Sequence, residues 1–93
     1  MSEKTRVSFI GGGVMANAFV ESLLGKKVVH EDDIKVSSRS QSTLEVMRER
    51  HHVAVTLSNR EAAQFGQVVI LAVKPQNLRH VFADIKGVMR PEQ

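Results

Sequence analysis

Three observations predict that this sequence folds as an α/β protein. Short apolar segments alternate with segments of helical periodicity, the connections between them are short, and residues 68–73 are apolar throughout. A continuous apolar strand is typical of a parallel sheet that is covered on both faces. Alternating strands and helices with short connections predict right-handed crossovers. We therefore expect a doubly wound parallel sheet with strand order 3-2-1-4 and helices on both faces.

The first half of the chain predicts two strands and two helices. Residues 6–10 are β-branched and aromatic and stop at three glycines, which indicates a buried strand, and residues 34–37 form a second short strand. Between these strands a helix is expected over residues 14–24, with Gly25 as the C′ residue after its end. The predicted stripe of that helix consists of Met15, Ala18, Phe19, Ser22 and Leu23.

A second helix is expected next, with Leu44, Met47 and His51 along one face. Either Ser40 or Ser42 caps its first turn, and the latter stands three residues before a glutamate, as in a capping box. Methionines on apolar helical faces usually fill gaps in the core. We expect this of Met47 and of the methionine in the first helix.

The second half of the chain continues the alternation. Residues 53–56 alternate like a third strand, and Ser58 then opens a short helix that stops at Gly66. After the apolar strand at residues 68–73, Pro75 suits the first turn of a fourth helix. That helix has the clearest amphipathic pattern in the chain, formed by Leu78, Val81, Phe82 and Ile85.

The predicted strand order leaves residues 68–73 at an edge of the sheet. Natural domains cover a long apolar edge strand, because its unpaired backbone groups can pair with another chain. A fifth strand would be expected to begin where the sequence stops, at Gln93. We therefore expect residues 1–93 to be an incomplete doubly wound domain, the N-terminal part of a longer protein.

Composition argues against several classes of function. The formal net charge is +3, but the basic residues are dispersed and all four aromatic residues are phenylalanine. Nucleic-acid binders usually combine a basic groove with aromatic stacking surfaces, so we expect no nucleic-acid partner. The chain has no cysteine, and its four histidines lack metal-ligand spacing. No apolar run is long enough for a membrane span, and the N-terminus does not read as a secretory signal, which favours a cytoplasmic location.

The residues after the first strand indicate a dinucleotide site. Residues 11–16 (GGGVMA) match G-x-G-x-x-G/A between a predicted strand and a predicted helix. Gly11 would allow the tight turn, Gly13 would let the backbone approach a pyrophosphate, and Ala16 would let helix and strand pack closely. Free N–H groups at the helix start would face the anion. The pattern predicts a Rossmann-like dinucleotide-binding domain over residues 1–93; the alternative is a glycine-rich turn without a ligand.

The end of the second strand decides between NAD and NADP. Asp32 and Asp33 lie at the sequence distance of a ribose-binding acid, but they precede the strand, whereas ligands bind beyond its carboxyl end. At that end Ser38 and Arg39 stand without an acid and would hold the 2′-phosphate of NADP. We therefore expect NADP(H) as the cofactor, with NAD(H) as the alternative. A second, compatible interpretation is a helix cap beside a solvated arginine.

We expect no metal ligand and no catalytic residue in this chain. Lys74 could serve as an acid, but a single lysine before Pro75 is more often structural. The sequence contains no Ser/His/Asp or Cys/His arrangement that would indicate nucleophilic catalysis.

Four segments resemble those of a known family. Residues 9–16 (FIGGGVMA), followed by Ala18, resemble the start of pyrroline-5-carboxylate reductase, which typically reads F-I-G-x-G-x-M-A-x-A. The resemblance recurs at residues 36–40 (VSSRS), 55–59 (VTLSN) and 68–76 (VVILAVKPQ), so it covers the chain in order. The AVKP segment is much more specific than the glycines.

The resemblance implies reduction of 1-pyrroline-5-carboxylate to L-proline with NAD(P)H, the last step of proline biosynthesis. It implies a cyclic imine substrate and a homo-oligomer. The cofactor-binding residues carried over by position are Ile10, Gly11, Gly12, Gly13, Val14, Met15, Ser38, Arg39, Asn59, Ala72, Val73, Lys74 and Pro75.

Two departures from the family pattern matter. Gly12 stands where the family often has alanine, which is harmless. The family's later strands and its helical C-terminal domain, which form the dimer and hold the substrate, are absent from residues 1–93. The resemblance therefore implies that this chain alone has no reductase activity.

Two other functions remain open from the sequence. One is a domain similar to an F420-dependent NADP reductase, which shares the glycine-rich start. Asn59 and the Lys74–Pro75 pair favour the pyrroline-5-carboxylate reductase family over it. The other is a stand-alone NADP-binding module without catalysis.

Overall fold

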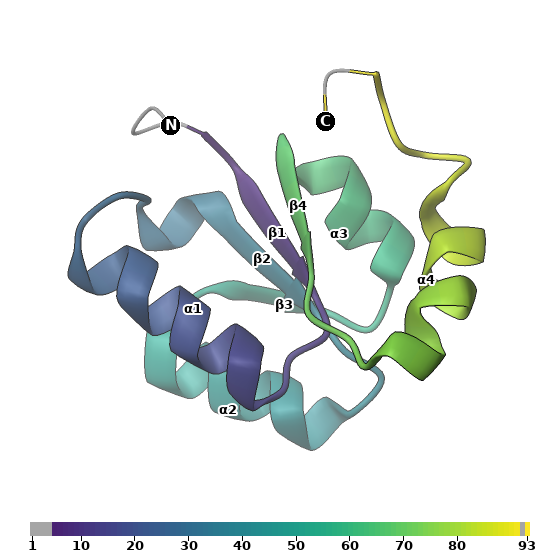
Figure 1. The fold of residues 1–93 in the computed structure, drawn as a ribbon. Helices are drawn as coiled ribbons and strands as arrows, with labels where there is room; N and C mark the ends of the chain where they lie inside the picture. The colour runs from purple at the N-terminus through teal and green to yellow at the C-terminus, as the bar shows by residue number, and fades with distance from the viewer. Residues whose placement is uncertain (1–4, 92) are drawn as a thin grey trace.

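The computed structural model describes residues 5–91 and 93, which form a parallel sheet of four strands. The strand order, β3-β2-β1-β4, confirms the predicted order. Because the strands are parallel, their carboxyl ends meet at one edge of the sheet, and each strand is followed there by a helix or by a 3₁₀ turn that leads into one (Figure 1). The strands are β1 (Val7–Ile10), β2 (Ile34–Ser37), β3 (Ala54–Thr56) and β4 (Val68–Leu71).

The fourth strand stops two residues before the end of the apolar run. Ala72 still donates its N–H to the carbonyl of Ile10, at 2.8 Å. Gly11, the first residue after β1, has a φ of 104 and turns away from β4. The backbone pairing between β1 and β4 therefore ends before Val73. The strand predicted over residues 68–73 is therefore shorter than expected, and Val73, beyond its end, lines a cleft at the sheet edge.

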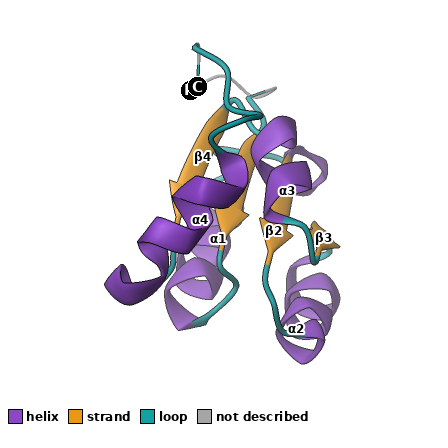
Figure 2. Ribbon diagram, turned by 90° about the vertical axis from the view of Figure 1, so that its right-hand side faces the viewer, coloured by secondary structure: helices purple, strands orange, loops and turns teal. Residues whose placement is uncertain are grey.

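Helices cover both faces of the sheet, as the sequence predicted. Figures 1 and 2 together show one pair of helices on one face and the second pair on the other. The first pair is α1 (Val14–Gly25) and α2 (Gln41–His51), and the second is α3 (Asn59–Phe65) and α4 (Leu78–Ile85). Two 3₁₀ turns complete the fold: η1 (Glu31–Asp33) precedes β2, and η2 (Pro75–Asn77) precedes α4. No helix in the described part of the chain is long and apolar enough to cross a membrane.

The core divides into two clusters because successive residues of β1 point to opposite faces. Phe9 belongs to the cluster beneath α1 and α2, together with Leu44 and Met47 as predicted. Ile10 belongs to the cluster beneath α3 and α4. In α4 the predicted core face is only partly right: Val81 and Ile85 are buried and Leu78 is partly buried, but Phe82 is 54% exposed.

The predicted buried stripe of α1 is wrong by about one residue. The fully buried positions are Ala16 and Val20, whereas Met15 is 66% and Phe19 is 48% exposed. Ala16 lies against the sheet because the glycine turn brings the start of the helix close to β1. The helix carries apolar residues on several sides, so its sequence does not define a unique buried face. Ala18 and Ser22 are also exposed, and only Leu23 of the stripe packs against the core.

Helix ends were predicted with mixed success. Gly25 belongs to α1, and the left-handed residue after the helix is Lys27, with φ 55. Ser40, not Ser42, caps α2: its Oγ accepts the N–H of Thr43 at 3.3 Å. Ser58 caps α3 as predicted, accepting the N–H of Glu61 at 3.1 Å.

Candidate functional site

The turn between β1 and α1 joins three strand ends. Gly11 donates its N–H to the carbonyl of Ser37, at 2.8 Å, and so ties the turn to the end of β2. Its φ of 104 lies in the left-handed half of the map, and a Cβ on it would come within 2.4 Å of the carbonyl oxygen of Ala72. Only glycine fits at this position.

The following glycines differ from the first in their surroundings. A Cβ on Gly12 would meet Thr43 Cγ2 at 3.0 Å and Ser38 Cβ at 3.3 Å, so this residue is packed against the β2–α2 connection. Gly13 has an ordinary φ of −77, and a Cβ there would meet nothing within 4 Å. The space beside Gly13 is open, and within the described residues no side-chain hydrogen bond caps the start of α1. Backbone donors and a helix dipole therefore face an open region at the sheet edge.

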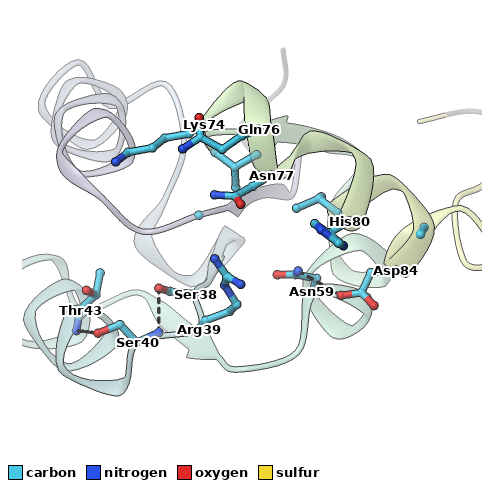
Figure 3. A pocket seen from close by; sticks show the side chains of 14 residues that line it. Ser38, Arg39, Ser40, Thr43, Asn59, Lys74, Gln76, Asn77, His80 and Asp84 are labelled. Atoms are coloured by element: carbon cyan, nitrogen blue, oxygen red, sulfur yellow. Dashed lines mark hydrogen bonds between the residues drawn. The ribbon is translucent and has the colours of Figure 1, made fainter.

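A cleft of about 940 Å³ extends from this turn across the carboxyl ends of the strands. Figure 3 shows two walls: the β2–α2 connection lies on one side and the η2–α4 segment on the other. Arg39 projects between the walls, and Lys74 belongs to the opposite wall. Both cations thus border the same space.

The β2–α2 connection is ordered by its serines. Ser38 Oγ accepts the N–H of Ser40 at 3.2 Å (Figure 3). Ser40 Oγ lies 3.0 Å from Ser42 Oγ. Arg39 is exposed, and it forms no ion pair with any residue that the structure describes. A fixed loop with hydroxyls, a helix start and an unpaired guanidinium has the chemistry of a phosphate site. Asp33 lies in η1 at the opposite edge of the sheet, where the sequence placed it.

Asn59, which the resemblance places at the cofactor, forms hydrogen bonds within the protein. Its Oδ1 accepts the hydroxyl of Ser37 at 2.8 Å, and its Nδ2 donates to Asp84 Oδ2 at 3.2 Å. The amide therefore connects the end of β2 to α4. It still lines the cleft, but internal hydrogen bonds fix its orientation.

The structure brings some of the residues expected at the cofactor together and leaves others outside the cleft. Ile10 is buried in the core, whereas Val14 and Met15 are 88% and 66% exposed at the start of α1. Gly12, Gly13, Ala72 and Pro75 border the site without lining the cleft itself. The expected residues that line it are Gly11, Ser38, Arg39, Asn59, Val73 and Lys74.

Sequence reasoning missed one wall of the cleft. The polar face of α4 and the turn before it contribute Gln76, Asn77, His80 and Asp84. The signal was present, because two of these residues stand four apart on one helix beside a predicted strand end. Polar residues on an amphipathic helix usually face solvent, however, so this spacing alone does not distinguish a cleft wall from an ordinary surface.

The fold shifts the pKa values of Glu61 and His51, which lie outside the cleft. The hydroxyl of Thr56, and then the Lys35 ammonium 3.4 Å away, hold the pKa of Glu61 below its usual value. Burial lowers the pKa of His51, and the positive charge of Arg50 adds to this effect. These groups support the fold rather than the cleft.

Comparison with known proteins identifies the family of this chain. A sequence model described as NADP oxidoreductase, coenzyme F420-dependent, matches residues 6–92. Pyrroline-5-carboxylate reductase from Synechocystis is 35% identical over 82 residues, which are 88% of this chain and 31% of that protein. The structure of a pyrroline-5-carboxylate reductase from Coxiella burnetii matches with a TM-score of 0.89 and 33% identity, over 95% of this chain and 32% of the other.

A more distant structure, the Plasmodium falciparum pyrroline carboxylate reductase with NADP bound, shares the fold at 21% identity, with a TM-score of 0.74 over 95% of this chain and 31% of the other. The chain thus spans about a third of the length of the relatives it matches. The predicted resemblance to pyrroline-5-carboxylate reductase is confirmed. Because the family model covers nearly the whole sequence, the chain belongs to the NADP oxidoreductase, coenzyme F420-dependent, family.

Proposed function

We propose that this chain is the NADP(H)-binding part of an oxidoreductase that reduces 1-pyrroline-5-carboxylate to L-proline. One observation carries the proposal: the open glycine turn leads into a cleft where Arg39 stands without an acidic partner among the described residues. The turn suits a pyrophosphate, and the arginine suits one further phosphate. NADP carries both groups, whereas NAD lacks the second.

Different residues of the cleft would hold different parts of the coenzyme. The backbone at Gly11 and Gly13 and the N–H groups of α1 would hold the pyrophosphate. Ser38 and Arg39 would hold the 2′-phosphate, and residues 72–75 would lie beside the nicotinamide, which supplies the hydride when the coenzyme is bound. The chain's own task is to bind and orient, because a fixed reaction geometry lowers the barrier by about 7–11 kcal/mol.

The substrate assignment is supported by the names of the relatives, and the homo-oligomer is proposed from the family resemblance alone. The relatives carry the name pyrroline-5-carboxylate reductase, and this chain corresponds to about a third of their length. We therefore place the cyclic imine site and the homo-oligomer interface in parts of the whole protein outside residues 1–93. A cytoplasmic location belongs to the same proposal, and cell fractionation would test it.

Calorimetric titration of NADPH and NADH into the purified chain tests the coenzyme assignment. A charge-assisted contact is worth about 1.5–3 kcal/mol, so NADPH should bind about ten- to a hundredfold more tightly. Arg39→Ala should remove this preference, while Arg48→Ala, a change to an exposed arginine on α2 outside the cleft, should keep it. Equal affinities for the two coenzymes in the unmodified chain would contradict the proposal.

The family description favours a second candidate, electron exchange between NADP and coenzyme F420. Both candidates use the same NADP site, so coenzyme binding does not distinguish them. The full-length natural protein should be assayed with NADPH and pyrroline-5-carboxylate, and separately with reduced F420 and NADP. Turnover only in the second assay would replace the reductase assignment and leave the NADP site in place.

A further inference from the structure

A single carboxylate, that of Asp84, lies among the described residues that line the cleft. Its Oδ2 accepts the amide N–H of Asn59 at 3.2 Å, and that amide is fixed in turn by the hydroxyl of Ser37. Arg60 donates to the backbone carbonyl of Asp84, not to its carboxylate. The side chain is therefore oriented by one neutral partner, and no cation among the described residues forms an ion pair with it.

A carboxylate in a phosphate-binding cleft restricts what can lie beside it. It repels a phosphate, so the 2′-phosphate belongs near Ser38 and Arg39 and away from Asp84. The group next to Asp84 should be neutral and should donate hydrogen bonds, since a carboxylate only accepts them. In a dinucleotide whose 2′-phosphate sits at Arg39, the base carried by the same ribose is the nearest such group.

The wall around Asp84 suits a flat ring. His80 faces the cleft from α4, and Figure 3 shows Arg39 projecting from the opposite wall. Val81 and Ala83 add apolar surface on the same helix. Bases stack on guanidinium and aromatic planes, and adenine presents an exocyclic amine that donates hydrogen bonds.

We propose that Asp84 recognises the 6-amino group of adenine and selects it against purines that carry a 6-oxo group. The inference rests on the proposed NADP function and adds to it the feature that reads the base. Asn59 acts as the positioning residue, because it holds the carboxylate while its own amide is held by Ser37. A 6-oxo purine would place an acceptor opposite an acceptor, which leaves both groups unpaired.

Calorimetric titration with NADPH and with its hypoxanthine analogue, deamino-NADPH, tests this assignment without any turnover. The unmodified chain should bind NADPH about tenfold or more tightly than the analogue. Asp84→Asn should reduce the ratio to about twofold or reverse it, because an amide can accept from Asn59 and donate to the 6-oxo group. Asp32→Asn removes a carboxylate at the far edge of the sheet and should keep the original ratio.

The outcomes separate the two proposals. Equal binding of both coenzymes by the unmodified chain would overturn the role of Asp84 and leave the NADP site standing, and this comparison needs no variant to fold. A tenfold preference that survives in Asp84→Asn would also overturn it. Binding of neither coenzyme would instead remove the proposed function itself.

Discussion

Gly11 and Gly13 stand two residues apart in one turn, yet they answer different requirements. Gly11 needs its positive φ and lies so close to Ala72 that a Cβ would meet the carbonyl oxygen at 2.4 Å. Gly13 has an ordinary φ, and a Cβ there would meet nothing within 4 Å. Packing within the protein explains the first glycine and leaves the second unexplained. The second therefore points to something outside the chain, and the proposed pyrophosphate is what would lie there.

The polar side chains also divide into those with partners inside the fold and those that face the cleft without one. His51 is buried and its Nε2 contacts Asn17 Oδ1, so its polar group is used inside the fold. Arg39 projects into the cleft and has no ion-pair partner among the described residues. A polar group with an internal partner supports the fold, whereas one without such a partner at a sheet edge is available to a ligand. Substitutions on each side of this division should therefore affect different measurements.

The largest effect on stability is expected at Gly11. Gly11→Ala places a side chain in a strained conformation and against the backbone of Ala72, which together cost about 2–5 kcal/mol of unfolding free energy. Urea denaturation followed by circular dichroism would measure this loss. Gly25→Ala is the matched control: its Cβ meets nothing within 4 Å and it lies in α1, so the same exchange should stabilise the chain by about 0.5–1 kcal/mol. Equal effects at the two positions would contradict the role given to Gly11.

Gly13→Val should produce the opposite pattern. The residue can adopt φ −77 and has space around it, so unfolding free energy should change by no more than about 1 kcal/mol. Its two methyl groups would occupy the space proposed for the pyrophosphate, and NADPH affinity should fall about ten- to a hundredfold. Calorimetry on the folded variant measures this loss. Undiminished binding would mean that the phosphates lie elsewhere.

Local rules and topology were enough to predict part of the molecule. The strand order follows from short connections and right-handed crossovers, and the placement of Arg39 and Asp33 at opposite ends of β2 follows from that order. Ser58 could be recognised as a cap because its partner is three residues away. Each of these features depends on neighbours in sequence or on the direction of a strand.

Features that depend on three-dimensional contacts were not predictable. The buried face of α1 is set by the close approach of Ala16 to the sheet, and a helix with several apolar sides does not reveal it. His80 and Asp84 reach the cleft because α4 lies beside the end of β2, although β2 ends at Ser37, 43 and 47 residues earlier in the chain. Lys27 takes the left-handed conformation two residues after Gly25, which does not take it.

Two neighbouring serines offer a smaller test of the same division. Ser40 accepts the N–H of Thr43 and caps α2, although it also lines the cleft. Ser40→Ala should lower unfolding free energy by about 1 kcal/mol, as expected for a lost helix cap. Ser42→Ala, which removes no backbone contact, should change it by less than about 0.5 kcal/mol. Thermal denaturation of both variants checks this order, and the reverse order would assign the cap to Ser42.

The smallest effect is expected from the buried histidine at the end of α2. Burial lowers the pKa of His51, Arg50 and His52 lower it further, and Glu21 opposes them by raising it. Because the folded chain holds the proton less tightly, the unfolded chain binds more protons as the pH falls below the ordinary pKa of about 6.5. The contribution of His51 is therefore complete above that pH and is lost as the pH falls toward the lowered pKa of the folded state.

Urea denaturation at a series of pH values between about 7 and 5 would measure this loss, with His51→Gln as the variant that cannot titrate. The unmodified chain should lose unfolding free energy more steeply than His51→Gln over this range. His30→Gln, a change to an exposed histidine before η1, serves as the control for the removal of an imidazole. Carboxylates titrate in all three proteins, so the difference between the curves isolates His51. Parallel curves for the unmodified chain and His51→Gln would show that the contact between His51 and Asn17 survives protonation of His51. The contact would then give no evidence that His51 serves the fold, in contrast to the polar groups that face the cleft.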